Sequence, residues 1–348
     1  MRIKRANLLN LLALTLLLAG CQPPGVIFPP LANAPVFPAP PEVTRISYVG
    51  QLITDADLKP ARDFFKTIGQ SLFGKDEVHS MLTPFGICTD GQDRLFVADS
   101  NAQVVHVFNL NSRKYSIWKP GENRNFSQPV TLAWDPAGRL LVADSVAGTI
   151  FVFDTSGKLL AEWGKGFLSR PCGIAIDPKS NRIAVVDTGA HQLVILSSTG
   201  ELVSRIGQRG TALGQFNYPT HVTIDHAGRI YVSDTLNFRV QQFSPDLKPV
   251  RQIGSKGDLP GYFSQPKAVA VDSQDHLYVI DSNFESVQIF TPDGQLLMDF
   301  GEEGRGPAEF WLPGGIFIDS HDRIWIADSY NRRVQVFDYH ARNDEGKP

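Results

Sequence analysis

Six aspartates recur along this sequence at nearly constant spacing, and a ring of carboxylates could perform several kinds of chemistry. Carboxylate oxygens bind divalent cations, and a carboxylate can also act as a general base. The intervals between the six are 45, 43, 47, 47 and 47 residues. The elements that carry these aspartates decide which chemistry applies. The six are Asp99, Asp144, Asp187, Asp234, Asp281 and Asp328.

The segments around the aspartates are predicted to be β-strands. Arg229–Phe243 reads RIYVSDTLNFRVQQF, and nearly the same residues return as RIWIADSYNRRVQVF at Arg323–Phe337. Ile, Val, Tyr and Phe alternate with other residues, and Gly, Asp and Pro interrupt the pattern every few positions, which excludes long helices. A repeat of this length that is built from strands is typical of propeller blades.

Each repeat contains four predicted strands. A proline opens the first strand, a tight turn such as Pro136–Arg139 leads to the second, a polar loop leads to the third, and a turn such as Pro292–Gly294 leads to an outer strand. Four strands in each of six units predict an all-β, six-bladed β-propeller. The opening prolines are Pro84, Pro129, Pro171, Pro219, Pro266 and Pro313.

The ring is predicted to close with a strand from the N-terminal side. The sixth repeat ends at Phe337 without an outer strand, whereas Arg45–Thr54 is a strand with no repeat of its own. Pairing the two removes an exposed sheet edge. The predicted propeller therefore spans residues 44–338, and residues 339–348 form a polar tail.

The repeats resemble the NHL family. Repeats four and six carry its pattern best, with Arg-Ile-Tyr/Trp before the aspartate (preceded by Gly in the fourth) and Asn-x-Arg-Val-Gln after it. The fifth has Glu285 and Ser286 where Phe-Arg would stand, the first has Asn101 but no arginine, and the second and third lack both residues. The resemblance covers about residues 84–338 and implies a propeller.

We interpret the repeat aspartates as structural braces, because a feature present in every blade is a requirement of the blade. A carboxylate at a strand end can accept hydrogen bonds from the N–H groups of the following loop and from the neighbouring Ser/Thr, Asn and Arg side chains. Arg239 and Arg332 are the arginines expected to pair with them. No catalytic residue is predicted.

Enzymes on similar propellers imply two other kinds of site. Amidating lyases hold zinc with several histidines near the axis, but here only His221 lies near the start of an inner strand, and His226, His276 and His321 fall in turns on the opposite face. Lactonase-like propellers use Glu, Asn and Asp from inner strands, and the inner strands here supply no Glu or Asn. No metal and no cofactor is therefore predicted.

Function is expected where the repeats differ, on the face shared by the loops before the first strand and the loops between the second and third strands. Aromatic residues and scattered charges on such a face suit a protein, peptide, glycan or small ligand. A binding scaffold is the predicted function, and a lyase or lactonase-like hydrolase with a site at the channel mouth is the alternative. The candidate residues are Arg170, Tyr218, His221, Phe238, Lys267, Phe284, Trp311 and Tyr330.

The overall charge argues against nucleic acid as a partner. The chain has 33 basic and 36 acidic residues, a formal net charge of −3, and no block of Lys and Arg. Proteins that bind nucleic acid by electrostatic attraction carry a basic patch.

Residues 1–20 resemble a bacterial lipoprotein signal peptide. Basic residues within Arg2–Arg5 precede an apolar run, Leu8–Leu18, and the run ends in the lipobox-like Leu-Ala-Gly-Cys. The resemblance implies that Cys21 is acylated and anchors the protein in a membrane. Gln22, in place of Asp, implies the outer membrane, with the propeller facing the periplasm or the outside. Another envelope protein, a peptide or a glycan is the expected partner.

Two segments outside the repeats have their own predictions. Residues 21–43 contain eight prolines and are predicted to form an extended tether of about 60 Å. Residues 55–83 contain Phe64, Ile68 and Leu72 at helical spacing. This insert either packs on one face of the propeller, caps the channel, or binds a membrane or a partner.

The two remaining cysteines, Cys88 and Cys172, leave two interpretations open. In an oxidising compartment they could form a disulfide. Their positions in the first and third repeats favour two small buried thiols instead.

Overall fold

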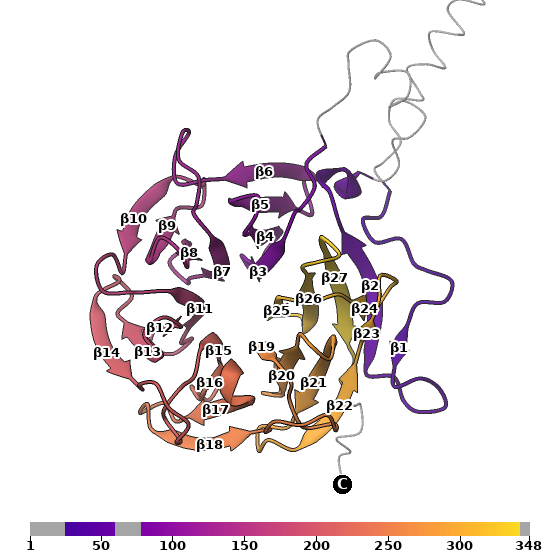
Figure 1. Cartoon of the computed structure of the whole chain (residues 1–348). Helices are drawn as coiled ribbons and strands as arrows, with labels where there is room; N and C mark the ends of the chain where they lie inside the picture. The colour runs from indigo at the N-terminus through magenta and orange to yellow at the C-terminus, as the bar shows by residue number, and fades with distance from the viewer. Residues whose placement is uncertain (1–24, 60–77, 342–348) are drawn as a thin grey trace, which may run out of the picture.

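The computed structural model describes residues 25–59 and 78–341, and it is a six-bladed β-propeller. Figure 1 views the propeller along its central axis, with the first strand of every blade nearest the centre and the fourth strand farther out. Each blade is an antiparallel sheet, and in blades one to five the strands follow one another in chain order. The predicted fold class, with four-stranded blades in a closed ring, is confirmed.

Blades one to five each take their four strands from one continuous stretch of chain. In chain order these strands are β3 (Pro84–Thr89), β4 (Arg94–Asp99), β5 (Val104–Asn109) and β6 (Lys114–Trp118); β7 (Pro129–Trp134), β8 (Leu140–Asp144), β9 (Thr149–Phe153) and β10 (Leu159–Trp163); β11 (Pro171–Ile176), β12 (Ile183–Asp187), β13 (Gln192–Leu196) and β14 (Leu202–Ile206); β15 (Pro219–Ile224), β16 (Ile230–Asp234), β17 (Arg239–Phe243) and β18 (Pro249–Ile253); β19 (Pro266–Val271), β20 (Leu277–Asp281), β21 (Ser286–Phe290) and β22 (Leu296–Phe300).

Blade six combines the two ends of the described chain. Its inner three strands are β25 (Gly315–Ile318), β26 (Arg323–Asp328) and β27 (Arg333–Tyr339), and β2 (Ile46–Leu52) pairs antiparallel with β27 as the fourth. The predicted closing strand is therefore confirmed. The last strand runs two residues beyond Phe337, because Asp338 and Tyr339 pair with Ser47 and Ile46.

Residues 25–43 differ from the free tether that their prolines predicted. A short strand, β1 (Val36–Phe37), pairs with β2 and adds a fifth strand to blade six. Ile27 and Phe28 pack on the apolar cluster between blades six and one. Apolar side chains placed between the prolines hold this part of the segment against the propeller, which an extended linker in water would not do.

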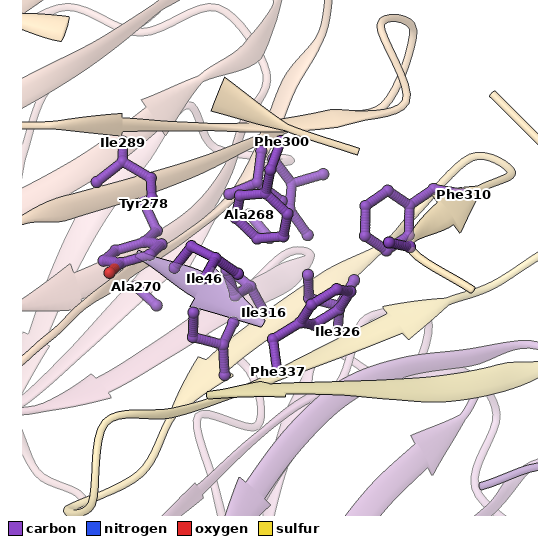
Figure 2. Close-up of a cluster of buried hydrophobic side chains, with 14 of the residues drawn as sticks. Ile46, Ala268, Ala270, Tyr278, Ile289, Phe300, Phe310, Ile316, Ile326 and Phe337 are labelled. Carbon is purple, nitrogen blue, oxygen red and sulfur yellow. The ribbon is translucent and has the colours of Figure 1, made fainter. Parts of the chain in front are cut away.

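Apolar clusters between neighbouring blades form the core. Consecutive residues of β26 point in opposite directions, so Ile324 and Ile326 pack toward blade five while Trp325 and Ala327 pack toward blade one. Figure 2 shows the cluster between blades five and six. Each buried side chain of this size contributes about 1.5–3 kcal/mol, so a blade is stable only between two neighbours.

The closing strand serves both neighbours of blade six. Ile46 packs in the cluster toward blade five, whereas Leu52 packs in the cluster toward blade one. Residues with even spacing on a regular strand would face the same side. A shift of register between Tyr48 and Gly50 in the pairing with β27 reverses the alternation.

The remaining described elements are short. They are the 3-10 helices η2 (Asp55–Leu58) and η3 (Thr235–Asn237) and a parallel pair, β23 (Glu302–Glu303) with β24 (Glu309–Phe310). The predicted helix through Phe64, Ile68 and Leu72 lies outside the described residues. In the described part of the chain, no helix is long and apolar enough to span a membrane. Cys88 is buried, Cys172 is partly buried, and both are free thiols.

Candidate functional site

The repeat aspartates end the second strand of each blade and hold two loops at once. Asp234 is fully buried and accepts hydrogen bonds from Asn237 Nδ2 (2.8 Å), Arg239 Nε (2.9 Å) and Gln241 Nε2 (2.9 Å). It also accepts one from the backbone N–H of Asn217, which precedes the first strand (2.6 Å). The other five aspartates bond in the same way to the segment before their own first strand, a contact that the sequence analysis missed.

Blade six corrects the expected arginine by one residue. Arg333, not Arg332, donates from Nε to Asp328 Oδ2 at 2.7 Å. Arg332 has a φ of 58° and occupies the left-handed position that Phe238 occupies in blade four. Arg333 is buried and also donates to Gln51 Oε1 on the closing strand (2.8 Å) and to the backbone of Gly306 (2.7 Å). It therefore joins the N-terminal strand to the last blade.

The Ser/Thr residues that follow the aspartates do not bond to them as predicted. Thr235 Oγ1 donates a 2.8 Å hydrogen bond to the carbonyl oxygen of Pro266. Pro266 is the first residue of the next blade. Such a bond crosses five of the six blade junctions. The other donors and acceptors are Ser100 with Pro129, Thr188 with Pro219, Ser282 with Pro313, and Ser329 with Pro84. Ser145 is the exception and bonds to Gln128 of its own blade.

These loops surround a funnel at the centre of the ring. The cavity measures about 520 Å³, and its residues come from all six blades. The residues directly after the opening prolines lie in its wall, because the inner strands start there. These wall residues are Phe85, Val130, Cys172, Thr220, Lys267 and Gly314. The outer part of the funnel includes Arg170, Tyr218, Leu236 and Tyr330.

His221 forms the floor of the funnel. It also lines a separate channel of about 790 Å³ that opens on the opposite face, and no other described residue lines both. The inner strands are close together at this level, since a β-carbon on Gly173 would lie 2.8 Å from the Cα atom of His221. The funnel and the channel are therefore two sites that meet at one side chain.

Burial keeps several groups in the funnel wall uncharged or destabilises their charge. Burial lowers the pKa of His221 to about 4, and its Nδ1 accepts a 3.4 Å hydrogen bond from the backbone N–H of Val269. Burial raises the pKa of the Cys172 thiol. Burial also lowers the pKa of Lys267, whose Nζ lies 4.7 Å from the centre of the Phe85 ring.

The structure brings five of the eight candidate residues together in the funnel, namely Arg170, Tyr218, His221, Lys267 and Tyr330. The other three do not line it. Phe238 lies under Lys256 (Nζ to ring centre 5.0 Å), Trp311 packs between Arg305 and Tyr330, and Phe284 is half-buried in its loop.

Sequence reasoning missed three apolar members of the funnel: Phe85, Val130 and Leu236. A comparison of the residues that follow the six prolines would have found the first two. Leu236 occupies the position two residues after the aspartate, where blade six has Tyr330.

The histidines and acids lie in pairs elsewhere. His226 Nδ1 lies 2.9 Å from Asp275 Oδ1, and His276 Nδ1 lies 2.9 Å from Asp272 Oδ2, both in turns on the face opposite the funnel. Within residues 25–59 and 78–341, no three side chains of His, Cys, Asp or Glu are grouped closely enough to hold a metal ion. The described chemistry of the funnel is thus that of a cationic and aromatic site.

Two family comparisons match parts of this chain. Residues 216–243, which include the first three strands of blade four, match the NHL repeat, and residues 262–343 match a family described as a 6-bladed beta-propeller. The first match lies where the sequence carries the NHL pattern best.

The curated relatives are similar over short stretches. The human E3 ubiquitin-protein ligase NHLRC1 is 32% identical over 80 residues, which is 23% of this chain and 20% of the ligase. The human NHL repeat-containing protein 3 is 39% identical over 56 residues, 16% of each chain. This chain therefore spans about a fifth or less of the length of these relatives.

Solved structures resemble the propeller as a whole. An auxiliary nutrient binding protein from Bacteroides thetaiotaomicron superimposes with a TM-score of 0.59 at 15% identity, over 75% of this chain and 70% of that one. A streptogramin B lyase superimposes with a TM-score of 0.55 at 12% identity, over 75% of this chain and 94% of that one. At such low identity these likenesses show the fold alone.

Proposed function

We propose that this protein is a lipid-anchored binding protein of the cell envelope, whose propeller holds a ligand at the funnel. The ligand is a peptide, a glycan or a surface of another envelope protein. One observation carries the proposal: a central cavity of about 520 Å³ whose wall is part apolar and part cationic, with exposed aromatic and aliphatic side chains at its edge. Concave sites with a few polar groups are typical binding sites.

The edge of the funnel presents apolar surface to solvent. Tyr218 is 42% exposed, Leu236 43% and Tyr330 56%, and all three line the same cavity. Single exposed apolar residues are common on soluble proteins, but a group around one cavity indicates an interaction surface.

The type of residue that stands two positions after each repeat aspartate alternates around the ring. Blades two, four and six carry exposed apolar residues there, and these are Val146, Leu236 and Tyr330. Blades one and five carry asparagines, which bond back to their own blades: Asn101 to Thr83 Oγ1 (2.7 Å) and Asn283 to Ser264 Oγ (3.1 Å). This alternation favours a partner that contacts several blades at once.

The ionisation of the funnel residues favours binding over catalysis. With a pKa of about 4, His221 is neutral and its Nδ1 already accepts a hydrogen bond. Cys172 stays a thiol, because burial raises its pKa, and the thiolate is the nucleophilic form. No carboxylate is among the described residues that line the funnel, so a carboxylate base for a lyase or hydrolase is missing there. The nutrient binding protein named above shares the fold, which is compatible with a binding role.

The anchor is the second part of the proposal. Cys21 lies outside the described residues, and its acylation is inferred from the lipobox-like sequence alone. Residues 25–43 run along the outer edge of blade six, where β1 lies at the periphery of the ring (Figure 1). An anchor that precedes them would join the propeller from that side.

Crosslinking in native membranes tests the binding role. The full chain would be compared with a funnel variant (Tyr218→Ala, Leu236→Ser and Tyr330→Ala), and partners that crosslink to the full chain should be lost from this variant. A matched control replaces three exposed apolar residues of outer strands (Leu160→Ser, Val250→Ser and Leu297→Ser) and should keep them. Equal capture by all three proteins would contradict a ligand at the funnel.

A further inference from the structure

The two central cavities differ in whether their charged side chains have partners of opposite charge. In the channel on the opposite face, Asp90 pairs with Arg94 (Oδ2 to Nε 2.7 Å), and Asp135 pairs with Arg139 (Oδ2 to Nε 2.6 Å). In the funnel, the charged lining residues are Arg170 and Lys267, and no described carboxylate accompanies them. The described residues that line the funnel therefore carry a net positive charge, in a protein whose total charge is negative. The repeat aspartates behind the wall accept hydrogen bonds from the backbone of the same loops, as Asp187 does from the N–H of Arg170.

Lys267 is held in the wall of the funnel without an anionic partner. It follows Pro266 at the start of β19, and no carboxylate of the described residues lies within ion-pair distance of its Nζ. Its ammonium group lies over the Phe85 ring at 4.7 Å. A partly buried cation that has lost part of its hydration and gained only an aromatic face is poorly compensated. A ligand anion would supply the missing partner.

Most other polar groups of the funnel wall are already engaged. Ser100, Thr188 and Thr235 donate their hydroxyl hydrogens to proline carbonyls of the next blade. Asn101 donates to Thr83 Oγ1, and Ser145 donates to Gln128 Oε1. Among the lining side chains, the donors that remain include those of Arg170, Lys267, Tyr218 and Tyr330. The inner wall offers apolar contact through Phe85 and Val130.

We infer that the funnel binds an apolar carboxylate, with the carboxylate group at Lys267 Nζ and the apolar body against Phe85 and Val130. Arg170, exposed at the edge of the same cavity, attracts the anion as it approaches. The inference rests on the proposed binding function and names the chemistry of its ligand. Either the C-terminal carboxylate of a polypeptide with an apolar last residue or a free organic acid carries this chemistry.

Calorimetric titration of the full chain in nonionic detergent tests the inference with paired probes. The acids are 3-phenylpropanoate and a short acetylated peptide that ends in leucine with a free carboxylate. Each is compared with its amide, which has the same shape without the charge. We expect the acids to bind at least about tenfold more tightly than their amides, the size of one charged hydrogen bond. Tighter binding of the peptide assigns a polypeptide C-terminus, and tighter binding of phenylpropanoate assigns a free acid.

Two variants locate the anion. Lys267→Met should weaken binding of the acids by about tenfold or more and leave the amides unchanged, and Lys267→Arg should retain binding because it keeps the charge. Lys256→Met is the matched control, since Lys256 also lies over an aromatic ring, that of Phe238, but outside the funnel. This control should bind as the unaltered chain does.

Several results would overturn the inference: no binding of either acid, equal binding of acids and amides, unchanged binding by Lys267→Met, or binding of glucuronate as tight as that of phenylpropanoate. The last result would assign an acidic sugar instead. If the inference failed but the proposed function held, the crosslinking experiment would still capture partners whose binding depends on Tyr218, Leu236 and Tyr330. Their absence would contradict the proposed function itself.

Discussion

Ser329 Oγ donates a 2.6 Å hydrogen bond to the carbonyl oxygen of Pro84, 245 residues earlier in the chain. This bond joins the last blade to the first at the level of the funnel. The same relation between a Ser/Thr and the proline of the next blade crosses four other junctions, so a local repeat in the sequence creates a continuous ring of bonds.

Replacing Ser329 by alanine should lower the free energy of unfolding by about 1 kcal/mol, because the buried carbonyl of Pro84 loses its donor. Chemical denaturation would measure the change. Ser145→Ala is the matched control, since Ser145 occupies the same place in blade two but bonds within its own blade. An equal loss in both variants would mean that the bond across the junction adds nothing.

Arg333→Met should lower the free energy of unfolding by about 3 kcal/mol, because the change leaves the buried carboxylate of Asp328 without its charged partner. Arg332→Met removes the same charge one residue earlier and should change stability little, since Arg332 makes no ion pair among the described residues. Thermal and denaturant unfolding of both variants would check this. If Arg332→Met were the more damaging, the assignment of the brace to Arg333 would be wrong.

Removal of the closing strand should destabilise the whole propeller. Deleting residues 44–54 removes Ile46, Tyr48 and Leu52, each worth about 1.5–3 kcal/mol when buried, and it exposes the edge of β27. The unfolding transition should shift by tens of degrees or lose its cooperativity. Deleting residues 25–43 should have a smaller effect, because β1 contributes only a two-residue edge and Ile27 and Phe28 are only partly buried. Unchanged melting after the first deletion would refute closure by β2.

Stability should depend on pH through His221. Its folded-state pKa of about 4 lies below the ordinary value of 6.5, so the unfolded chain binds more protons between these values. The free energy of unfolding should therefore fall as the pH drops from 6.5 to 4, by on the order of 1–3 kcal/mol from this residue. His221→Gln should lack this part of the pH dependence. Parallel curves for the two proteins from pH 7 to pH 4 would contradict a neutral buried His221.

Cys21→Ser should leave the protein unacylated and absent from the membrane fraction. Incorporation of labelled palmitate into the unaltered chain, and its loss in this variant, would measure the anchor directly. Cys172→Ser is the control and should keep both label and membrane association, because Cys172 lies in the propeller. Membrane association that survives Cys21→Ser would contradict the lipobox prediction.

The candidate site was only partly predictable from the sequence. Five candidates were found because they differ between repeats, and they line the funnel because their positions face the axis. They are Arg170, Tyr218, His221, Lys267 and Tyr330. Phe238 and Trp311 are equally variable, but their rings turn toward Lys256 and Arg305 on neighbouring loops. Side-chain direction in a loop depends on contacts with other segments, and no local pattern in the sequence records it.

The sequence by itself determined the number of blades, their strands and the strand that closes the ring. Those features depend on short-range periodicity, since each blade repeats one pattern of prolines, apolar strands and aspartates. The closing strand follows from the same pattern, because Arg45–Thr54 is a predicted strand that belongs to no repeat. Only the tertiary structure decided that Ser329 bonds to Pro84, that Arg333 replaces Arg332 as the brace, and that residues 25–43 pack on blade six. These contacts depend on which segments meet across the ring. The same is true of Lys267, because the residues that surround its ammonium group come from distant parts of the chain.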